Sequence, residues 1–402
     1  MVSAKSNNSF LDKIQKAIRE EDLDGWFFCN FRHRDPLSDE ILRRPKTLTN
    51  SRFWFYFVPA AGEPLAVVHA IEADHLDNLP GKKQCYAGRD ELQKYLSCLA
   101  GKTIAVHMSE SITAVSFLDA GTYCALSGAG IKLVSADCLI QRFKGLLDKE
   151  EIASHERSAA VLYGIIETVW DFVRSSYGAG KTLYEGDLRD LMEDEFVRQN
   201  MERDHPPQAA SGINCTNPHY DFTGKGKVIR EGDIIQLDLW AKERLPGSIY
   251  ADIAWAGVYG KKAESGAEKV FADLAEIREA VLDFLCGSFT ERKKSGETLT
   301  GAKLDALCRS LLCKKGYGQA IKHRTGHGID TEVHGSGVNI DSFEFPDTRC
   351  ILEGSCFSLE PGIYLAGYGF RTEINVYIQD GLPRISGKGA EKQGRQFKLL
   401  TV

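Results

Sequence analysis

Residues 232–255 read GDIIQLDLWAKERLPGSIYADIAW. Apolar residues alternate with other residues on both sides of a turn that contains Pro246 and Gly247, which predicts two antiparallel strands joined as a hairpin. Asp238 lies inside the first strand and Asp252 inside the second, between apolar neighbours that face the opposite way. A carboxylate buried in a strand is unfavourable unless it is paired or bound to a cation. The two aspartates therefore either face each other at a metal site or are unrelated residues at strand ends or in salt bridges.

Three of the ten histidines fall within one short segment, HRTGHGIDTEVH at residues 323–334. They are His323, His327 and His334. Glycines flank His327 on both sides, so backbone or a substrate could approach it closely. A neutral imidazole suits a divalent metal. Taken alone, this segment could also be a structural loop.

A second pair of carboxylates follows near the C-terminus. Glu360 ends a predicted strand in SLEPG (358–362), and Glu373 begins the next strand in RTEINV (371–376). Arg371 stands two residues before Glu373, on the same face of a strand, where it could pair with a ligand carboxylate. Four carboxylates and one imidazole form an oxygen-rich ligand set that favours Mn²⁺, with Co²⁺ or Zn²⁺ as alternatives. The number suits two metal ions that share bridging carboxylates.

The whole chain is predicted to be α+β, with a boundary near residue 146. Residues 1–146 show short strand and helix patterns of a smaller mixed α/β domain, and residues 147–402 form a larger domain. A long amphipathic helix begins at Asp148, which is a good N-cap residue. The other predicted helices are 9–22, a stretch near 112–125, one that starts with a capping box at 182–185, and stretches near 265–286 and 301–315. The predicted strands are 25–28, 52–59, 64–70, 103–108, 131–135, 208–213, 233–241, 249–258, 355–365 and 370–379.

Composition excludes several classes of function. Charged residues make up 26% of the chain and its net charge is −6, which argues against a general nucleic-acid binder. No apolar stretch approaches the length of a transmembrane helix, and the N-terminus lacks the apolar segment of a signal peptide. Eleven cysteines without a CxxC pair predict reduced, mostly buried thiols. We therefore expect a cytoplasmic protein that binds neither nucleic acid nor a membrane.

The order Asp, Asp, His, Glu, Glu, with the motifs HxxxHG, VH, LEPG and RxE around it, resembles the prolidase and aminopeptidase P family. The resemblance is strong over residues 147–380 and weak over the first 145. It implies a pita-bread catalytic domain, of the creatinase and aminopeptidase type, preceded by a smaller α/β domain. It also implies a homodimer and peptide substrates with proline in the second position.

The same resemblance implies a role for each candidate ligand. Asp238 would bind one metal ion, His327 and Glu360 the other, and Asp252 and Glu373 would bridge the two. A hydroxide held between the metals would attack the peptide carbonyl, because metal binding lowers the pKa of water.

Four residues would carry the chemistry beside the metals. Glu360 would shuttle the proton to the leaving nitrogen, and His334 would donate to the carbonyl oxygen or its oxyanion. His323 would line the pocket for the residue after the cut, and methionine aminopeptidases generally lack it. His219, in NPHY, would contact the substrate near the metals, unless it is a surface loop histidine.

The chain departs from the family's pattern in three places. Asp238 and Asp252 are 14 positions apart where the family more often has 11, so we expect a longer hairpin loop. Asp330 stands where the family usually has glycine, and Gly335 stands where an acidic residue often follows VH. These last two changes bear on substrate specificity more than on metal binding.

The expected function is metal-dependent hydrolysis of the X-Pro bond, either in dipeptides or at the N-terminus of longer peptides. One alternative is a non-peptide C–N hydrolase of the creatinase type. Another is a catalytically inactive pita-bread module that binds a protein partner. The complete set of five ligands favours the peptidase over both.

Overall fold

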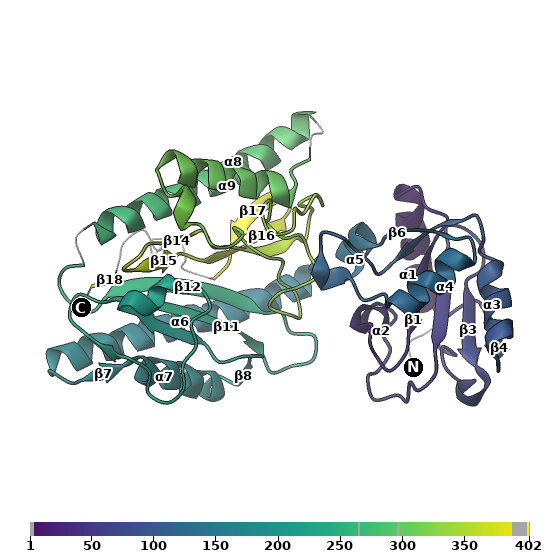
Figure 1. The fold of residues 1–402 in the computed structure, drawn as a ribbon, viewed down its shortest axis with the longest axis horizontal. Helices are drawn as coiled ribbons and strands as arrows, with labels where there is room; N and C mark the ends of the chain where they lie inside the picture. Colours follow the sequence, from purple (N-terminus) through teal and green to yellow (C-terminus); the bar gives the residue numbers. More distant parts are fainter. Residues whose placement is uncertain (1–3, 264–265, 296–297, 388–399, 402) are drawn as a thin grey trace. The chain divides into compact units, whose positions relative to one another are not determined.

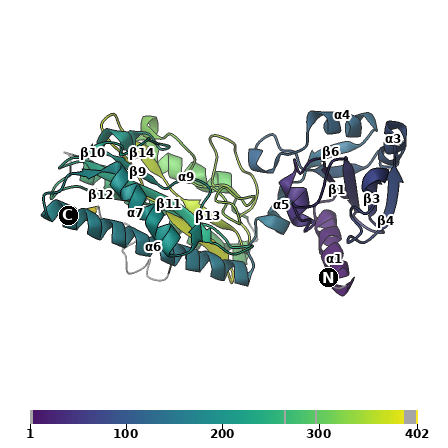
Figure 2. The ribbon, with the colours of Figure 1, turned by 90° about the horizontal axis from the view of Figure 1, so that it is seen from below.

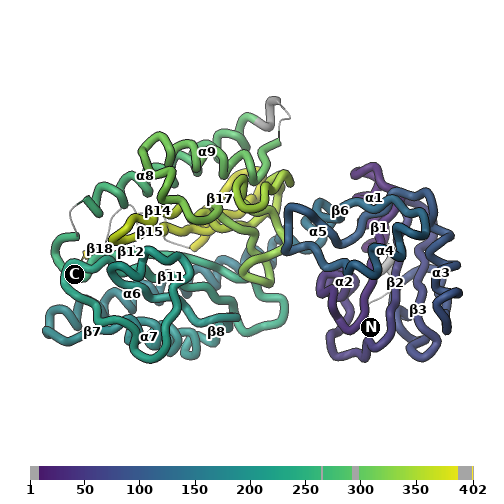
Figure 3. The backbone as a smooth tube through the Cα atoms, viewed as in Figure 1, coloured from purple at the N-terminus to yellow at the C-terminus, as the bar shows by residue number. Residues whose placement is uncertain are grey.

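The computed structural model divides the chain into two compact units, Met1–Lys144 and Gly145–Val402 (Figures 1 and 3). The residues that the structure describes are 4–263, 266–295, 298–387 and 400–401. Each unit has its own buried core.

The described strands of the first unit form a six-stranded mixed sheet in the order β4-β3-β2-β1-β5-β6. These strands are β1 (Gly25–Asn30), β2 (Trp54–Pro59), β3 (Leu65–His69), β4 (Lys82–Tyr86), β5 (Thr103–Val106) and β6 (Lys132–Ser135). The hairpin predicted from residues 52–70 is confirmed, because β2 and β3 pair antiparallel. Edge strand β4 was not predicted, since its first four residues are polar or exposed and show no apolar alternation.

Helices cover both faces of this sheet. Helices α1 (Ala4–Glu20), α2 (Pro36–Ile41) and α5 (Asp137–Lys144) pack on one face, and α3 (Arg89–Ser97) and α4 (Ala120–Gly128) on the other. The helix predicted near 112–125 is wrong in its bounds. A 3₁₀ turn occupies Thr113–Val115, and α4 starts only after Asp119, whose carboxylate accepts the backbone N–H groups of the first helical turn.

The second unit begins with the long helix α6 (Lys149–Gly178), and its predicted N-cap is confirmed. Asp148 and Glu151 form a reciprocal capping box. The capping box predicted at 182–185 is wrong, because α7 (Glu185–Arg198) is capped at Tyr184 with Asp187 as its partner. The Glu185 carboxylate is buried and accepts hydrogen bonds from the 211–227 segment instead.

The strands of the second unit lie between two helical layers, as Figures 1 and 2 show. Helices α6 and α7 pack against the hairpin of β11 (Ile234–Glu243) and β12 (Ala251–Val258). Helices α8 (Ala267–Ser295) and α9 (Gly301–Lys314) cover the C-terminal strands. The remaining strands are β7 (Leu183–Tyr184), β8 (Met201–Glu202), β9 (Gln208–Ser211), β10 (Val228–Ile229), β13 (Cys356–Leu359), β14 (Gly362–Tyr364), β15 (Gly369–Arg371), β16 (Ile374–Gln379), β17 (Leu382–Ile385) and β18 (Leu400–Thr401).

Two strands predicted as continuous are each broken at a glutamate. The 355–365 stretch divides into β13 and β14 around Glu360 and Pro361, and the 370–379 stretch divides into β15 and β16 around Thr372 and Glu373. Proline has no N–H to donate to a ladder, which accounts for the first break. Strand β13 pairs with β16, and β14 pairs with β15, so both glutamates lie where the chain passes from one pairing to the other.

The eleven cysteines all lie in the described part of the chain and none forms a disulfide bond, but the prediction that most are buried is wrong. Only four of them are buried, namely Cys29, Cys215, Cys308 and Cys356. Among the described residues, no helix has both the length and the apolar character needed to cross a membrane.

Candidate active site

The β11–β12 hairpin presents Asp238 and Asp252 on one face. Asp238 pairs with Ala254 across the ladder and Asp252 pairs with Trp240, so the two aspartates are diagonal neighbours on the same side. Both are buried. Leu237 and Leu239, on either side of Asp238, face the opposite way and pack in the core with α6 and α7.

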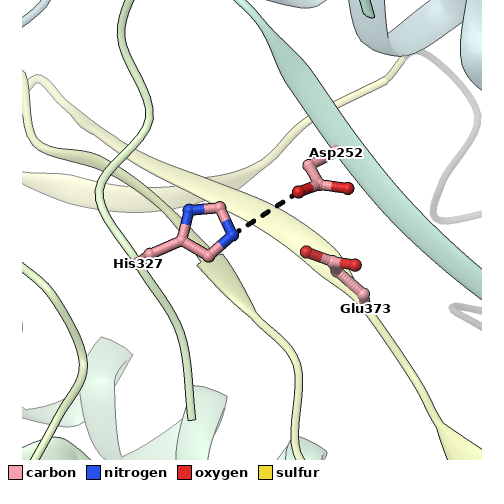
Figure 4. A group of neighbouring side chains, drawn as sticks. All are labelled: Asp252, His327 and Glu373. Carbon is pink, nitrogen blue, oxygen red and sulfur yellow. Dashed lines mark ion pairs between the residues drawn. The ribbon is translucent and has the colours of Figure 1, made fainter. Parts of the chain in front are cut away.

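Asp252, His327 and Glu373 converge from three separate parts of the chain (Figure 4). Each offers one ligand atom, and these atoms all lie within 4.8 Å of one another. The His327 Nε2 atom is 3.4 Å from Asp252 Oδ2 and 3.5 Å from Glu360 Oε1. Asp238 is connected to this group by Arg371, which pairs with Asp238 and whose Nε atom lies 4.0 Å from Glu360 Oε2. The structure therefore brings all five predicted ligands into one buried cluster.

Close backbone packing places His327 against β13. A Cβ atom on Gly326 would lie 2.0 Å from the carbonyl oxygen of Ser358, so only glycine fits there. The Ser358 hydroxyl accepts from the His327 N–H at 3.0 Å and donates to Glu360 Oε1 at 3.2 Å. One serine thus fixes the positions of two of the predicted ligands.

The orientation of the His327 ring also suits a metal ligand. Its Nδ1 lies 3.3 Å from the carbonyl oxygen of Gly328 and donates to it, which leaves the Nε2 lone pair facing the carboxylates. Burial lowers the pKa of His327 well below its usual value, so the imidazole is neutral.

Asn375, on strand β16, links this strand to β12, which carries Asp252. Asn375 was not predicted from the sequence. Its amide nitrogen donates to the Asp252 carbonyl at 2.6 Å, and its amide oxygen accepts from the Asp252 N–H at 2.8 Å. Asn375 follows Glu373 by two residues. The two hydrogen bonds between its side chain and the Asp252 backbone therefore hold Asp252 and Glu373 close together. The only signal in the sequence was a polar residue inside the apolar strand of RTEINV.

Arg371 forms an ion pair with Asp238 inside the cluster. Its Nη2 atom also lies 3.2 Å from Gln208 Oε1, and its Nε atom lies 4.0 Å from Glu360 Oε2. The arginine is buried, so its charge is little screened and offsets part of the negative charge of the site. Gln208 is a second residue that the sequence analysis missed.

The cluster holds more negative charge than its surroundings can balance. Burial raises the pKa of Asp252 well above its usual range, and the charges of Asp238 and Glu360 raise it further. Burial and the neighbouring carboxylates likewise raise the pKa of Glu373, and they raise that of Glu360 to about 7. Burial also raises the pKa of Asp238, although Arg371 opposes this. Carboxylates so placed favour a bound cation.

The residues present fit divalent metal ions. Asp252 Oδ1 is buried and makes no hydrogen bond with any described residue, which is costly in a protein interior. Carboxylate oxygens and one neutral imidazole are the donors that Mn²⁺, Co²⁺ and Zn²⁺ accept.

Two of the predicted catalytic histidines lie beside the cluster. The His334 ring is 4.3 Å from that of His327, centroid to centroid, in an edge-to-face arrangement. His323 Nδ1 donates to the carbonyl of Arg324 at 2.7 Å, and its Nε2 accepts from the Tyr364 hydroxyl at 2.8 Å. Burial lowers the pKa of His323 to about 3 and that of His334 to about 4, so both rings are neutral at physiological pH. No pattern in the sequence pointed to Tyr364.

The third predicted histidine, His219, is exposed. Its N–H donates to the Asn217 side chain at 3.1 Å. The adjacent Tyr220 is anchored, because its hydroxyl donates to the buried Glu185 at 3.0 Å. Pro218, the residue before His219, accepts a hydrogen bond from Arg371 Nη1 at 3.3 Å through its carbonyl, which places this loop beside the site.

The fold and the cluster together define a metallopeptidase of the pita-bread class. Residues 153–380 match the sequence profile of Metallopeptidase family M24, and this span is more than half of the chain. The chain therefore belongs to metallopeptidase family M24, as the motifs predicted.

The chain is similar to curated proteins and to solved structures. The Xaa-Pro dipeptidase of Lactobacillus delbrueckii subsp. lactis is 40% identical over 199 residues, which cover 48% of this chain and 46% of that protein. The structure of dipeptidase PepE from Mycobacterium ulcerans covers 98% of both chains with a TM-score of 0.72 and 20% identity. The N-terminal domain of FACT complex subunit SPT16 from chickpea (Cicer arietinum) covers 94% of this chain and 95% of its own, with a TM-score of 0.67 and 12% identity.

The structural matches confirm the predicted fold, a mixed α/β domain followed by a pita-bread domain. A dipeptidase and a subunit of a larger complex share this fold, so the fold alone does not determine the function. The side chains of the ligand cluster distinguish between the functions that this fold can carry.

Proposed function

We propose that this chain hydrolyses the bond between an amino acid and a following proline, with two divalent metal ions held by five residues. These residues are Asp238, Asp252, His327, Glu360 and Glu373. The convergence of Asp252, His327 and Glu373 within 4.8 Å is the observation that carries the proposal. When bound, the metal ions would polarise the peptide carbonyl and supply hydroxide near neutral pH.

The proposed roles of the surrounding residues follow from their positions. Glu360 is the proton shuttle, because its carboxylate lies beside His327 and is oriented by Ser358. His334 is neutral and can donate an N–H to the carbonyl oxygen of the substrate. His323 lines the pocket for the proline ring, and the Tyr364 hydroxyl holds its imidazole in place.

The preference for proline is supported by the relatives and by His323. A curated relative that is 40% identical over part of the chain is named an Xaa-Pro dipeptidase. An X-Pro bond is a tertiary amide without an N–H, so a dedicated pocket is needed to orient it. We further propose that Mn²⁺ is the native metal and that the protein is a cytoplasmic homodimer with a domain boundary at residue 146.

A peptide panel tests the proposed specificity. The metal-loaded protein is given Ala-Pro, Ala-Ala, Ala-Pro-Ala and a longer peptide with proline in the second position. We expect cleavage of at least one proline peptide and no comparable cleavage of Ala-Ala. The relative rates on Ala-Pro and the longer peptides distinguish a dipeptidase from an aminopeptidase.

The same panel, extended by creatine and by a measurement of bound divalent metal, tests the alternatives. Hydrolysis of creatine with no cleavage of any peptide would favour a creatinase-type C–N hydrolase. A protein that binds no stoichiometric divalent metal and cleaves none of these substrates would be a binding module.

A further inference from the structure

The loop of residues 328–336, which carries His334, contains both residues that replace the family's usual ones, Asp330 and Gly335. The loop is closed at its base, where the Gly335 N–H donates to the Gly328 carbonyl at 2.7 Å. His334 immediately precedes this closing bond. Its ring position therefore depends on how the loop is held.

The Asp330 carboxylate holds the loop from inside. It is almost fully buried, with 1% exposure. Its Oδ1 accepts from the Glu332 N–H at 2.9 Å, and its Oδ2 accepts from the Ser336 N–H at 2.8 Å. These two donors lie on either side of His334. A single carboxylate thus bridges the two arms of the loop that presents the imidazole.

The Asp330 backbone ties the loop to the metal-binding hairpin. Its carbonyl accepts from the Tyr250 N–H at 3.0 Å, two residues before Asp252. The position of the loop is therefore coupled to the strand that carries a predicted ligand.

Gly335 makes room for the carboxylate. A Cβ atom on Gly335 would lie 2.7 Å from Asp330 Cγ and 2.8 Å from its Oδ2, and it would also lie 2.8 Å from the Asp330 backbone nitrogen. Real Cβ contacts are not this short, so a side chain at position 335 and the carboxylate of residue 330 exclude each other. Asp330 and Gly335, the two residues that replace the family's usual ones, are therefore in direct contact.

We propose that Asp330 is a positioning residue that holds His334 edge-on to His327, with Gly335 as the small residue that this arrangement requires. This inference rests on the proposed function, in which His334 contacts the carbonyl oxygen of the substrate. Asp330 touches no substrate and acts only through the loop.

A double-mutant cycle on the Mn²⁺-loaded protein tests this role. We expect Asp330→Ala to lower kcat/KM for Ala-Pro by about 10- to 100-fold, as for other residues that orient a functional group. Asp330→Asn keeps one acceptor oxygen and should lose less. In a His334→Ala background, Asp330→Ala should change kcat/KM by less than about twofold, since its effect passes through the missing imidazole.

A matched control and a second readout separate positioning from general stability. Asp148 also accepts two backbone N–H groups, at the N-terminus of α6, and Asp148→Ala should leave kcat/KM unchanged. Hydrogen exchange of the 331–336 backbone should rise in Asp330→Ala and not in Asp148→Ala.

The proposal is overturned if Asp330→Ala lowers kcat/KM equally in the wild type and in the His334→Ala background. It is also overturned if hydrogen exchange of the 331–336 backbone is unchanged in Asp330→Ala. The exchange readout needs no activity. If the wild-type protein cleaves none of the proline peptides, the proposed function fails, and hydrogen exchange still decides whether Asp330 holds the loop.

Discussion

At the scale of single residues, Glu360 and Glu373 show how the chain builds the site. Each occupies a break between two short strands, where the backbone leaves one ladder and enters another. In a continuous strand, the regular alternation of the backbone would fix the direction of a glutamate side chain. A break in the strand lets the side chain turn toward the cluster. Asp238 and Asp252 need no such break, because the hairpin register already places them on one face.

Replacing Asp252 or Glu373 by alanine should abolish metal-dependent activity and leave the protein folded. The pKa of each carboxyl is already raised by burial and by its acidic neighbours, so its removal relieves repulsion in the metal-free protein. We expect the Tm of the metal-free variant to equal or exceed that of the wild type. Mn²⁺ should raise the Tm of the wild type and not of the variant. Full activity in either variant would show that the ligand is misassigned.

Asn375 should matter for both stability and metal binding. Asn375→Ala leaves the N–H and the carbonyl of Asp252 without their partner in the core, which costs roughly 2–4 kcal/mol of unfolding free energy. Because Asp252 then loses its fixed position, Mn²⁺ affinity should fall about 10- to 100-fold. Urea denaturation and a metal titration measure the two effects. If Asn375→Ala binds Mn²⁺ with the affinity of the wild type, Asn375 does not position Asp252 for metal binding.

The residues that sequence reasoning found and missed differ in kind. Asp238, Asp252, His327, Glu360 and Glu373 are charged or metal-binding residues placed against apolar patterns, so they are visible in the sequence. Asn375, Gln208 and Tyr364 act through contacts with partners distant in sequence. Tyr364 and His323 are hydrogen-bonded across a sequence separation of 41 residues. Gln208 and Arg371 are hydrogen-bonded across a separation of 163 residues. No local pattern reports such a contact.

At the scale of elements, a charge cluster joins α8 to the end of α9. Asp273 on α8 accepts from Lys269 at 2.5 Å, from the Tyr317 hydroxyl at 2.6 Å and from Lys315 at 2.9 Å. Burial acts to raise the pKa of Asp273, but these donors outweigh it and hold the pKa well below its usual value. The ionised carboxylate therefore stabilises the folded state.

The pH dependence of stability follows from this shift. A carboxyl whose folded pKa is depressed contributes stability above its unfolded pKa of about 4, and this contribution is lost as pH falls through the folded value. We expect Asp273→Asn to lower the unfolding free energy by about 1–3 kcal/mol at pH 7. The difference from the wild type should shrink below pH 4.

Urea denaturation at pH 7 and pH 3 measures this effect. Glu276→Gln is the matched control, because Glu276 also pairs with Lys315 but is mostly exposed, and we expect a change within about 0.5 kcal/mol. If Asp273→Asn lowers the unfolding free energy by the same amount at both pH values, the electrostatic account is contradicted.

The elements themselves were predictable where the pattern was long and its caps were regular. Helix α6 and the β11–β12 hairpin follow their apolar periodicity and begin near the predicted residues. Short elements were harder to predict, since the polar edge strand β4 and the 3₁₀ turn before α4 show little periodicity. The strand breaks at the glutamates were missed because apolar residues continue beyond each break, Leu359 and Ile363 around Glu360 and Phe370 and Ile374 around Glu373.

At the scale of the whole molecule, the five predicted ligands come from positions spread between residues 238 and 373 and meet in one buried cluster of the second unit. Their convergence depends on the pairing of β11 with β12 and of β13 with β16, which is a property of the complete fold. The order of the ligands and the family motifs predicted this fold. The contacts of Arg371 and Asn375 that orient the ligands required the structure.

The central claim, that the chain is a two-metal X-Pro peptidase, is tested most directly by a metal titration of activity. The protein is first stripped of metal with a chelator, and the initial rate of Ala-Pro hydrolysis is then measured as Mn²⁺ is added. We predict no hydrolysis without metal and a rate that reaches its maximum at about two ions per chain. Hydrolysis that persists in the metal-free protein, or its absence at every concentration of Mn²⁺, Co²⁺ and Zn²⁺ for all the proline peptides, would contradict the claim.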